Sequence, residues 1–224
     1  MPRRIDLDAR KAQLAEAVWQ VILGQGIAAV SVRTVAAQAG LAVGSLRHVF
    51  PTRAQLIEFS AGLMVERATE RIQAVPADGG PEAYALAVIA ELLPLQADSR
   101  AEFEVNLALL AESAALPGLV AIRDHAHQEI ARLCERLVAL VRRPGDAAAV
   151  PGSADPGRND CAADARRLHA LIDGLAFHLL HGPAGEDPAW ALDLIRAELA
   201  WIGRQTAPAG AVTGRPGAPR RPPL

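Results

Sequence analysis

Residues Ser31 to Phe50, SVRTVAAQAGLAVGSLRHVF, decide the fold of the N-terminal part of the chain. Ser31 precedes a helical run, and its hydroxyl can accept a hydrogen bond from a free backbone N–H at the start of that helix. Gly40 follows the run where the chain needs a left-handed residue, a conformation that glycine adopts without a Cβ penalty. A second short helix is predicted from Val43 to Val49. The stretch therefore predicts two closely crossing helices, as in a helix-turn-helix.

A helix-turn-helix of this kind fits a DNA-binding unit, but it also fits an ordinary pair of packed helices with no role in DNA binding. The distribution of charge favours DNA binding. Residues 1–55 contain seven Lys and Arg side chains and three Asp and Glu side chains, although the whole chain has a net charge of −2. A basic end on an acidic body is typical of a protein that contacts DNA through that end.

The segment from Arg10 to Phe59 carries a set of small, apolar and basic residues in fixed register. These are Ala17, Gly26, Ser31-Val32-Arg33, Val35-Ala36, Ala39-Gly40-Leu41, Gly44-Ser45-Leu46, Phe50, Arg53 and Leu56. In this pattern the segment resembles the N-terminal domain of TetR-family transcriptional regulators. Many members of that family have an aromatic residue directly after the leucine of the second helix, where this chain has Arg47. Two roles stay open for Arg47, because arginine can bond to guanine or to a phosphate.

Sequence-specific DNA binding needs contacts that position the protein and contacts that read the bases. For positioning on the phosphates we expect Ser31, Arg53 and Thr52. Ser45 fits either role, and His48 also fits a solvent-facing place at the end of the helix. Because one helix reads few base pairs, we expect a two-fold dimer on a palindromic double-stranded DNA operator. The residues expected to read bases are Arg33, Val43, Gly44, Ser45, Arg47 and His48.

The composition of the whole chain predicts an all-α protein of about nine helices. Of its 224 residues 51% are hydrophobic but only 4% are aromatic, and the many alanines favour helices over strands. We expect a DNA-binding domain at 1–52, a helical ligand-binding and dimerisation domain at 53–206, and a disordered Pro/Gly-rich tail at 207–224. Residues 143–160, rich in Pro, Gly and Asp, predict a long loop between two helices.

Two helices are predicted at the C-terminal end of the body, at 161–181 and 188–205. The resemblance to TetR-family proteins implies that they form a homodimer interface, and the small residues Ala165, Gly174 and Ala176 would permit close approach. A monomeric helical core is the alternative. The stretches GSLRHVFP and DGLAFHLLHG also resemble the branch related to the choline-responsive repressor BetI, without identifying a ligand for this chain.

The helices between 53 and 181 combine apolar faces with scattered polar groups, which is typical of a pocket for a small-molecule effector. For each lining residue, plain core packing is the alternative. An effector must bind one conformation of the protein better than the other, because equal affinity for both shifts nothing. The residues expected to line the pocket are Met64, Phe103, Asn106, Leu110, Phe177 and His178.

The sequence does not predict an enzyme. It contains no GxSxG elbow, no phosphate-binding loop and no CxxC pair. His125 and His127 point away from each other on a helix, and no carboxylate pattern accompanies His178 and His181, so we expect neither a metal site nor a cofactor.

The two cysteines lie far apart in the sequence, which fits a reducing compartment. The sequence shows neither a signal peptide nor an apolar run of ~18 residues, so we expect no membrane span and a cytoplasmic location. The alternative to a DNA-binding regulator is a helical protein-interaction module without specific DNA binding. Such a module would lack the steep salt dependence of a protein that binds duplex DNA.

Overall fold

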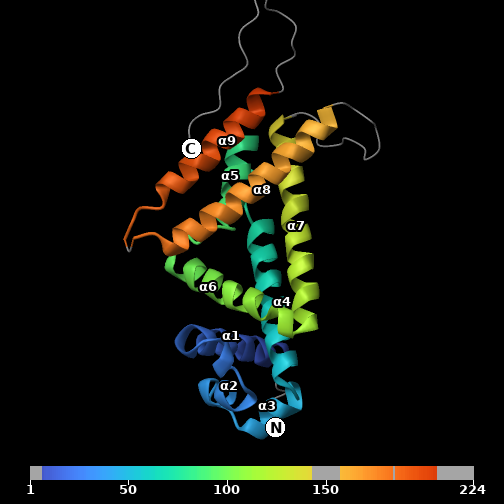
Figure 1. The fold of residues 1–224 in the computed structure, drawn as a ribbon, viewed down its shortest axis with the longest axis vertical. Helices are drawn as coiled ribbons and strands as arrows, with labels where there is room; N and C mark the ends of the chain where they lie inside the picture. The colour runs from blue at the N-terminus through green and yellow to red at the C-terminus, as the bar shows by residue number, and fades with distance from the viewer. Residues whose placement is uncertain (1–6, 143–156, 184, 206–224) are drawn as a thin grey trace, which may run out of the picture.

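The computed structural model describes residues 7–142, 157–183 and 185–205, which form an elongated molecule (Figure 1). These residues contain nine α-helices and no strand, which confirms the predicted all-α class. The helices, with two short 3-10 helices, are α1 (Leu7–Gln25), η1 (Ile27–Ala29), α2 (Val32–Gln38), α3 (Val43–Val49), α4 (Arg53–Gln73), α5 (Pro81–Ala90), α6 (Ala97–Glu112), η2 (Ser113–Ala115), α7 (Pro117–Arg142), α8 (Gly157–His181) and α9 (Ala189–Arg204).

The predicted bounds of α3 agree with the structure, but those of α8 do not. Helix α8 begins at Gly157, so the last four residues of the loop predicted at 143–160 are helical. The reason is that Asn159 and Asp160, although typical of loops, are also favourable in the first turn of a helix, where backbone N–H groups are unpaired. Residues 143–156 and the tail predicted at 207–224 lie outside the described residues.

Residues 7–52, which we call the head, occupy one end of the molecule, and α4 runs from the head into the body (Figure 1). The head is built around a stripe on α1, whose Leu14 and Val18 are fully buried. The same hydrophobic cluster, the head core, continues into the body through Leu56 of α4, Val105 of α6 and Leu119 of α7. The hydrophobic packing is therefore continuous across residue 52, where the domain boundary was predicted.

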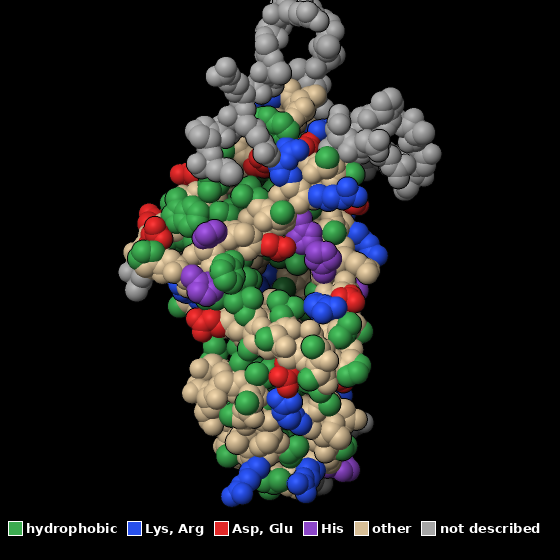
Figure 2. All heavy atoms as spheres, viewed as in Figure 1, with side chains coloured by type: hydrophobic (Ala, Val, Ile, Leu, Met, Phe, Trp, Pro, Cys, Tyr) green, Lys and Arg blue, Asp and Glu red, His purple; other side chains and the backbone are tan. Residues whose placement is uncertain are grey.

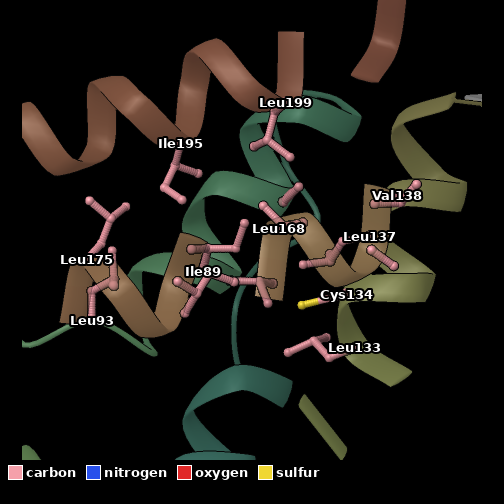
Figure 3. Packing of buried hydrophobic residues seen from close by; sticks show 14 of the residues in the cluster. Ile89, Leu93, Leu133, Cys134, Leu137, Val138, Leu168, Leu175, Ile195 and Leu199 are labelled. Carbon is pink, nitrogen blue, oxygen red and sulfur yellow. The ribbon is translucent and has the colours of Figure 1, made fainter. Parts of the chain in front are cut away.

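A second hydrophobic cluster, the body core, joins α5, α7, α8 and α9 at the other end of the molecule. Leu168 of α8 and Ile89 of α5 are fully buried at its centre. Figure 3 shows their side chains among those of Leu137 from α7 and of Ile195 from α9. Each of these four helices contributes an apolar face, and together they form the bundle that closes this end of the body.

Buried charges also tie α7, α8 and α9 together, in a set of side chains that we call the ion cluster. Asp164 lies at its centre with only 3% of its side chain exposed, and it pairs with Arg142 of α7. Its other carboxylate oxygen lies 3.1 Å from Arg167, which reaches towards Glu198 of α9 at 3.6 Å. The Arg167 guanidinium also stacks over the Trp201 ring at 4.6 Å. One carboxylate thus compensates two cations in the interior.

The buried thiol of Cys134 should make the stability of the protein depend on pH. Burial, and then the negative charges of Asp173 and Glu135, raise the pKa of its thiol to about 12. The unfolded chain loses this proton at lower pH than the folded chain does, so the folded state is favoured below the unfolded pKa and loses that advantage as pH rises towards 12.

We expect the free energy of unfolding by urea to fall by about 2 kcal/mol more in the wild type than in Cys134→Ala between about pH 8 and about pH 10.5. The comparison with the variant removes the contribution of every other titrating group. An identical loss in the two proteins would contradict the assignment to Cys134.

Candidate DNA interface and ligand pocket

The start of α2 is fixed by the capping contact predicted for Ser31. The Ser31 hydroxyl accepts a hydrogen bond from the backbone N–H of Thr34 at 3.1 Å, and the Thr34 hydroxyl oxygen accepts one from the Ser31 N–H at 2.9 Å. Thr34 Oγ1 also lies 2.7 Å from the carbonyl oxygen of Ala29, to which it donates. These bonds attach α2 to the preceding 3-10 helix η1 and occupy the Ser31 hydroxyl within the protein.

The turn between α2 and α3 has the geometry predicted from the sequence. Gly40 adopts a φ of 66°, in the left-handed region. The N–H of Leu41 donates to the carbonyl oxygen of Ala36 at 2.8 Å and closes the end of α2. Ala36 and Leu46 are both fully buried, so α3 crosses α2 closely through a leucine that points inwards. Val49 also packs partly against the head core, and the other residues of α3 are exposed.

The residues expected to read bases all lie on the exposed surface of the head. Arg33 and Arg47 make no hydrogen bond or ion pair with any described residue, so both guanidinium groups are available. A Cβ atom added at Gly44 would meet no atom within 4 Å, so internal packing does not require glycine there. Figure 2 shows basic side chains at this end of the molecule. The residues expected to read bases, each of them exposed, are Arg33, Val43, Gly44, Ser45, Arg47 and His48.

Thr52 and Arg53, two of the residues expected to contact phosphates, make hydrogen bonds within the protein. Thr52 caps α4, because its hydroxyl accepts from the N–H of Gln55 at 3.2 Å and donates to the Gln55 side chain at 3.1 Å. Arg53 turns inwards and donates to the carbonyl oxygens of Ile27 and Val30 and to Glu112. Three nitrogen atoms of Arg53 thus have partners within the protein, and the phosphate role expected for this residue stays a prediction.

A cavity of about 860 Å³ lies between α4, α6, α7 and α8, in the middle of the molecule. Figure 2 shows it as a hollow in the visible face, with His side chains near its rim. His178 is not among the residues that line it, because one helical step rotates His178 about 100° away from Phe177. The other five residues predicted for the pocket are among its lining: Met64, Phe103, Asn106, Leu110 and Phe177.

Polar groups that the sequence did not single out also line the cavity. The rings of His127 from α7 and His169 from α8 stack with their centroids 4.8 Å apart. His169 Nε2 lies 3.7 Å from a carboxylate oxygen of Asp173, one turn further along α8. On another wall Arg71 of α4 binds Glu102 of α6 at 2.9 Å. The i, i+4 spacing of His169 and Asp173 was visible in the sequence, but the approach of α7 was not.

The combination of an exposed helix-turn-helix with a central cavity in an all-α body matches known proteins. Residues 13–58 match the model described as bacterial regulatory proteins of the tetR family. Residues 81–203, more than half of the chain, match the model described as the C-terminal part of the BetI-type transcriptional repressor. The chain belongs to the TetR family. The resemblances stated from the sequence, including that to the BetI branch, are confirmed.

Three similar proteins place this TetR-family chain among regulators. The HTH-type transcriptional regulator PksA of Bacillus subtilis (strain 168) is 33% identical over 184 residues, which cover 82% of this chain and 84% of PksA. A transcriptional regulator from Rhodococcus sp. Rha1 superposes with a TM-score of 0.71 at 25% identity, over 87% of this chain and 96% of that one. A Saccharomonospora viridis protein, solved in complex with choline, has a TM-score of 0.66 at 21% identity, over 87% of this chain and 95% of that one.

The protein is thus a transcriptional regulator of the TetR family, with an N-terminal DNA-binding domain and a C-terminal ligand-binding domain. Its family and its relatives are regulators and not enzymes. In the part of the chain that the structure describes, no helix is long and apolar enough to span a membrane. Among the same residues, no three His, Cys, Asp or Glu side chains gather in a way that could hold a metal ion.

Proposed function

We propose that the protein is a homodimeric repressor that binds a palindromic operator and releases it when a small molecule occupies the central cavity. The observation that carries the proposal is the pair of guanidinium groups of Arg33 and Arg47, which lie on the exposed face of the head and have no partner among the described residues. Arginine bonds to guanine in the major groove, which admits a helix such as α3. A repressor of this kind meets its operator in the cytoplasm, where a bacterial chromosome lies.

The dimer would form through α8 and α9. The exposed surface of α8 includes Ala170 and Gly174, which permit close approach, and Phe177, which also lines the cavity and is 51% exposed. Ala165 and Ala176, also expected to permit close approach, are buried. On α9, Leu194 and Trp201 are only partly buried. Association would remove this apolar surface from water, and two-fold symmetry would place the two heads on two half-sites.

The effector would occupy the cavity of about 860 Å³, a volume within the range of small-molecule sites. That a structural relative was solved with choline supports a small molecule as the occupant, without naming it for this chain. The effector acts only if it binds better to a conformation in which the heads no longer match the half-sites.

Selection of random duplex DNA by the purified protein, followed by sequencing of the retained duplexes, tests the proposal. We expect a palindromic motif whose half-sites are separated by one helical turn or more. Retention without any enriched motif, or affinity that does not fall steeply with added salt, would instead favour a helical protein-interaction module.

Arg33→Ala and Arg47→Ala should each weaken binding to the selected duplex by about 1–3 kcal/mol and relax the preference at one base position. Fluorescence anisotropy titrations and a repeated selection measure the two effects. Arg196→Ala serves as the control, because Arg196 is an exposed arginine of α9, far from the head. An unchanged site preference in both head variants would refute base reading by these residues.

A further inference from the structure

Arg53, the first residue of α4, connects three parts of the protein. Its Nε donates to the carbonyl oxygen of Val30 and its Nη2 to that of Ile27, each at 3.0 Å. Its Nη1 binds Oε1 of Glu112 at 2.8 Å. The first two contacts hold the segment η1 that leads into the helix-turn-helix, and the third reaches the last residue of α6.

Glu112 lies in a stretch of chain that also forms a wall of the central cavity. Leu110, two residues before it, and Ser113, the residue after it, both line the cavity. The Ser113 hydroxyl donates to the carbonyl oxygen of Leu110 at 2.7 Å, which fixes the local turn. A displacement of this end of α6 by an occupant of the cavity therefore moves the carboxylate that Arg53 binds.

We propose that the pair Arg53–Glu112 is the joint between the ligand pocket and the DNA-binding head. Arg53 is a positioning residue: it holds η1, and through η1 the start of α2, in the orientation that the position of α6 dictates. Its fork suits this task, because a guanidinium bonds in several fixed directions at once, whereas a lysine ammonium is a single flexible point charge. The side chains are 34% and 25% exposed, so the pair is only partly screened by water.

The test compares Glu112→Ala with Glu104→Ala on the same helix. Glu104 is exposed and has no contact with a described residue, so both variants remove one negative charge, but only the first removes the partner of Arg53. By charge alone, each variant should bind DNA as tightly as the wild type or slightly more tightly. We expect Glu112→Ala instead to weaken binding to the selected duplex about two- to fivefold, and Glu104→Ala not to weaken it.

The dependence of affinity on salt separates positioning from phosphate contact. We expect Arg53→Lys to weaken binding as Glu112→Ala does, and both to keep the wild-type slope of log K against log salt. Equal affinities of Glu112→Ala and Glu104→Ala would overturn the proposal. So would a slope reduced by about one unit in Arg53→Ala together with wild-type binding by Glu112→Ala, because that result identifies a phosphate contact.

Hydrogen exchange tests the joint without DNA. The inference rests on the proposed control of operator binding by the cavity, so a readout independent of the operator is needed. The N–H groups of Ala29 and Val30 are bonded within η1, to Gly26 and Ile27. We expect peptides over residues 26–31 to exchange faster in Glu112→Ala than in Glu104→Ala, and equal exchange would overturn the joint. If the wild type selects no duplex, the proposed function fails, and the exchange result still decides the role of the pair.

Discussion

Replacement of Asp164 by asparagine should lower the free energy of unfolding by about 3 kcal/mol, because it removes the buried carboxylate that pairs with both Arg142 and Arg167. The substitution keeps the shape of the side chain, so the loss reflects charge and not packing. The Arg142 side chain is only 10% exposed, and water cannot replace the missing carboxylate there. For a protein of this size we expect the midpoint of thermal unfolding to fall by about 6–12 °C, measured by circular dichroism.

Asp193→Asn is the matched control for Asp164→Asn. Asp193 also pairs with an arginine three residues away on a helix, but its side chain is 69% exposed. Exposed pairs contribute about 0–1 kcal/mol, so the control should melt close to the wild type. If the two variants melt at the same temperature, the ion cluster does not hold α7, α8 and α9 together in the way inferred.

Leu46→Ala should destabilise the head by about 2–5 kcal/mol and abolish specific DNA binding. Leu46 is the buried residue of α3, a helix of seven residues whose N-terminus has no side-chain cap. So short a helix is not stable by itself and depends on its packing. Helicity of the body should persist, because the body core contains no residue of α3.

Val43→Ala on the same helix is the control for Leu46→Ala. Val43 is 37% exposed, so its truncation should change the free energy of unfolding by no more than about 0.5 kcal/mol. Unfolding by urea, followed by both near- and far-ultraviolet circular dichroism, measures the effect. A Leu46→Ala protein as stable as Val43→Ala would contradict the anchoring role of Leu46.

Local signals explain what the sequence could predict. The cap at Ser31 and the left-handed Gly40 each act within a few residues, and the structure has both where they were expected. The bounds of α3 followed from them. Five of the residues that line the cavity were also predictable, because apolar residues with a few polar neighbours on long helices indicate where a cavity can form.

Contacts between distant segments explain what the sequence could not predict. From its position in the sequence Arg53 was expected to bind phosphate. Its bond to Glu112, 59 residues later, depends on how α6 packs and could not be predicted. The stack of His127 on His169 depends on how α7 approaches α8. The exclusion of His178 from the cavity depends on the rotation of α8 about its axis. Neither the approach of α7 to α8 nor the rotation of α8 is encoded by a pattern within one helix.

The central cavity lies along the boundary between the head core and the body core. Its walls include Met64 and Leu119 from the head core, and Leu93 and Leu133 from the body core. A molecule bound there touches both cores and joins them into one cooperative unit. The same arrangement leaves room for evolutionary change: lining residues that belong to neither core, such as Asn106 and Leu110, can be exchanged while both cores keep their packing.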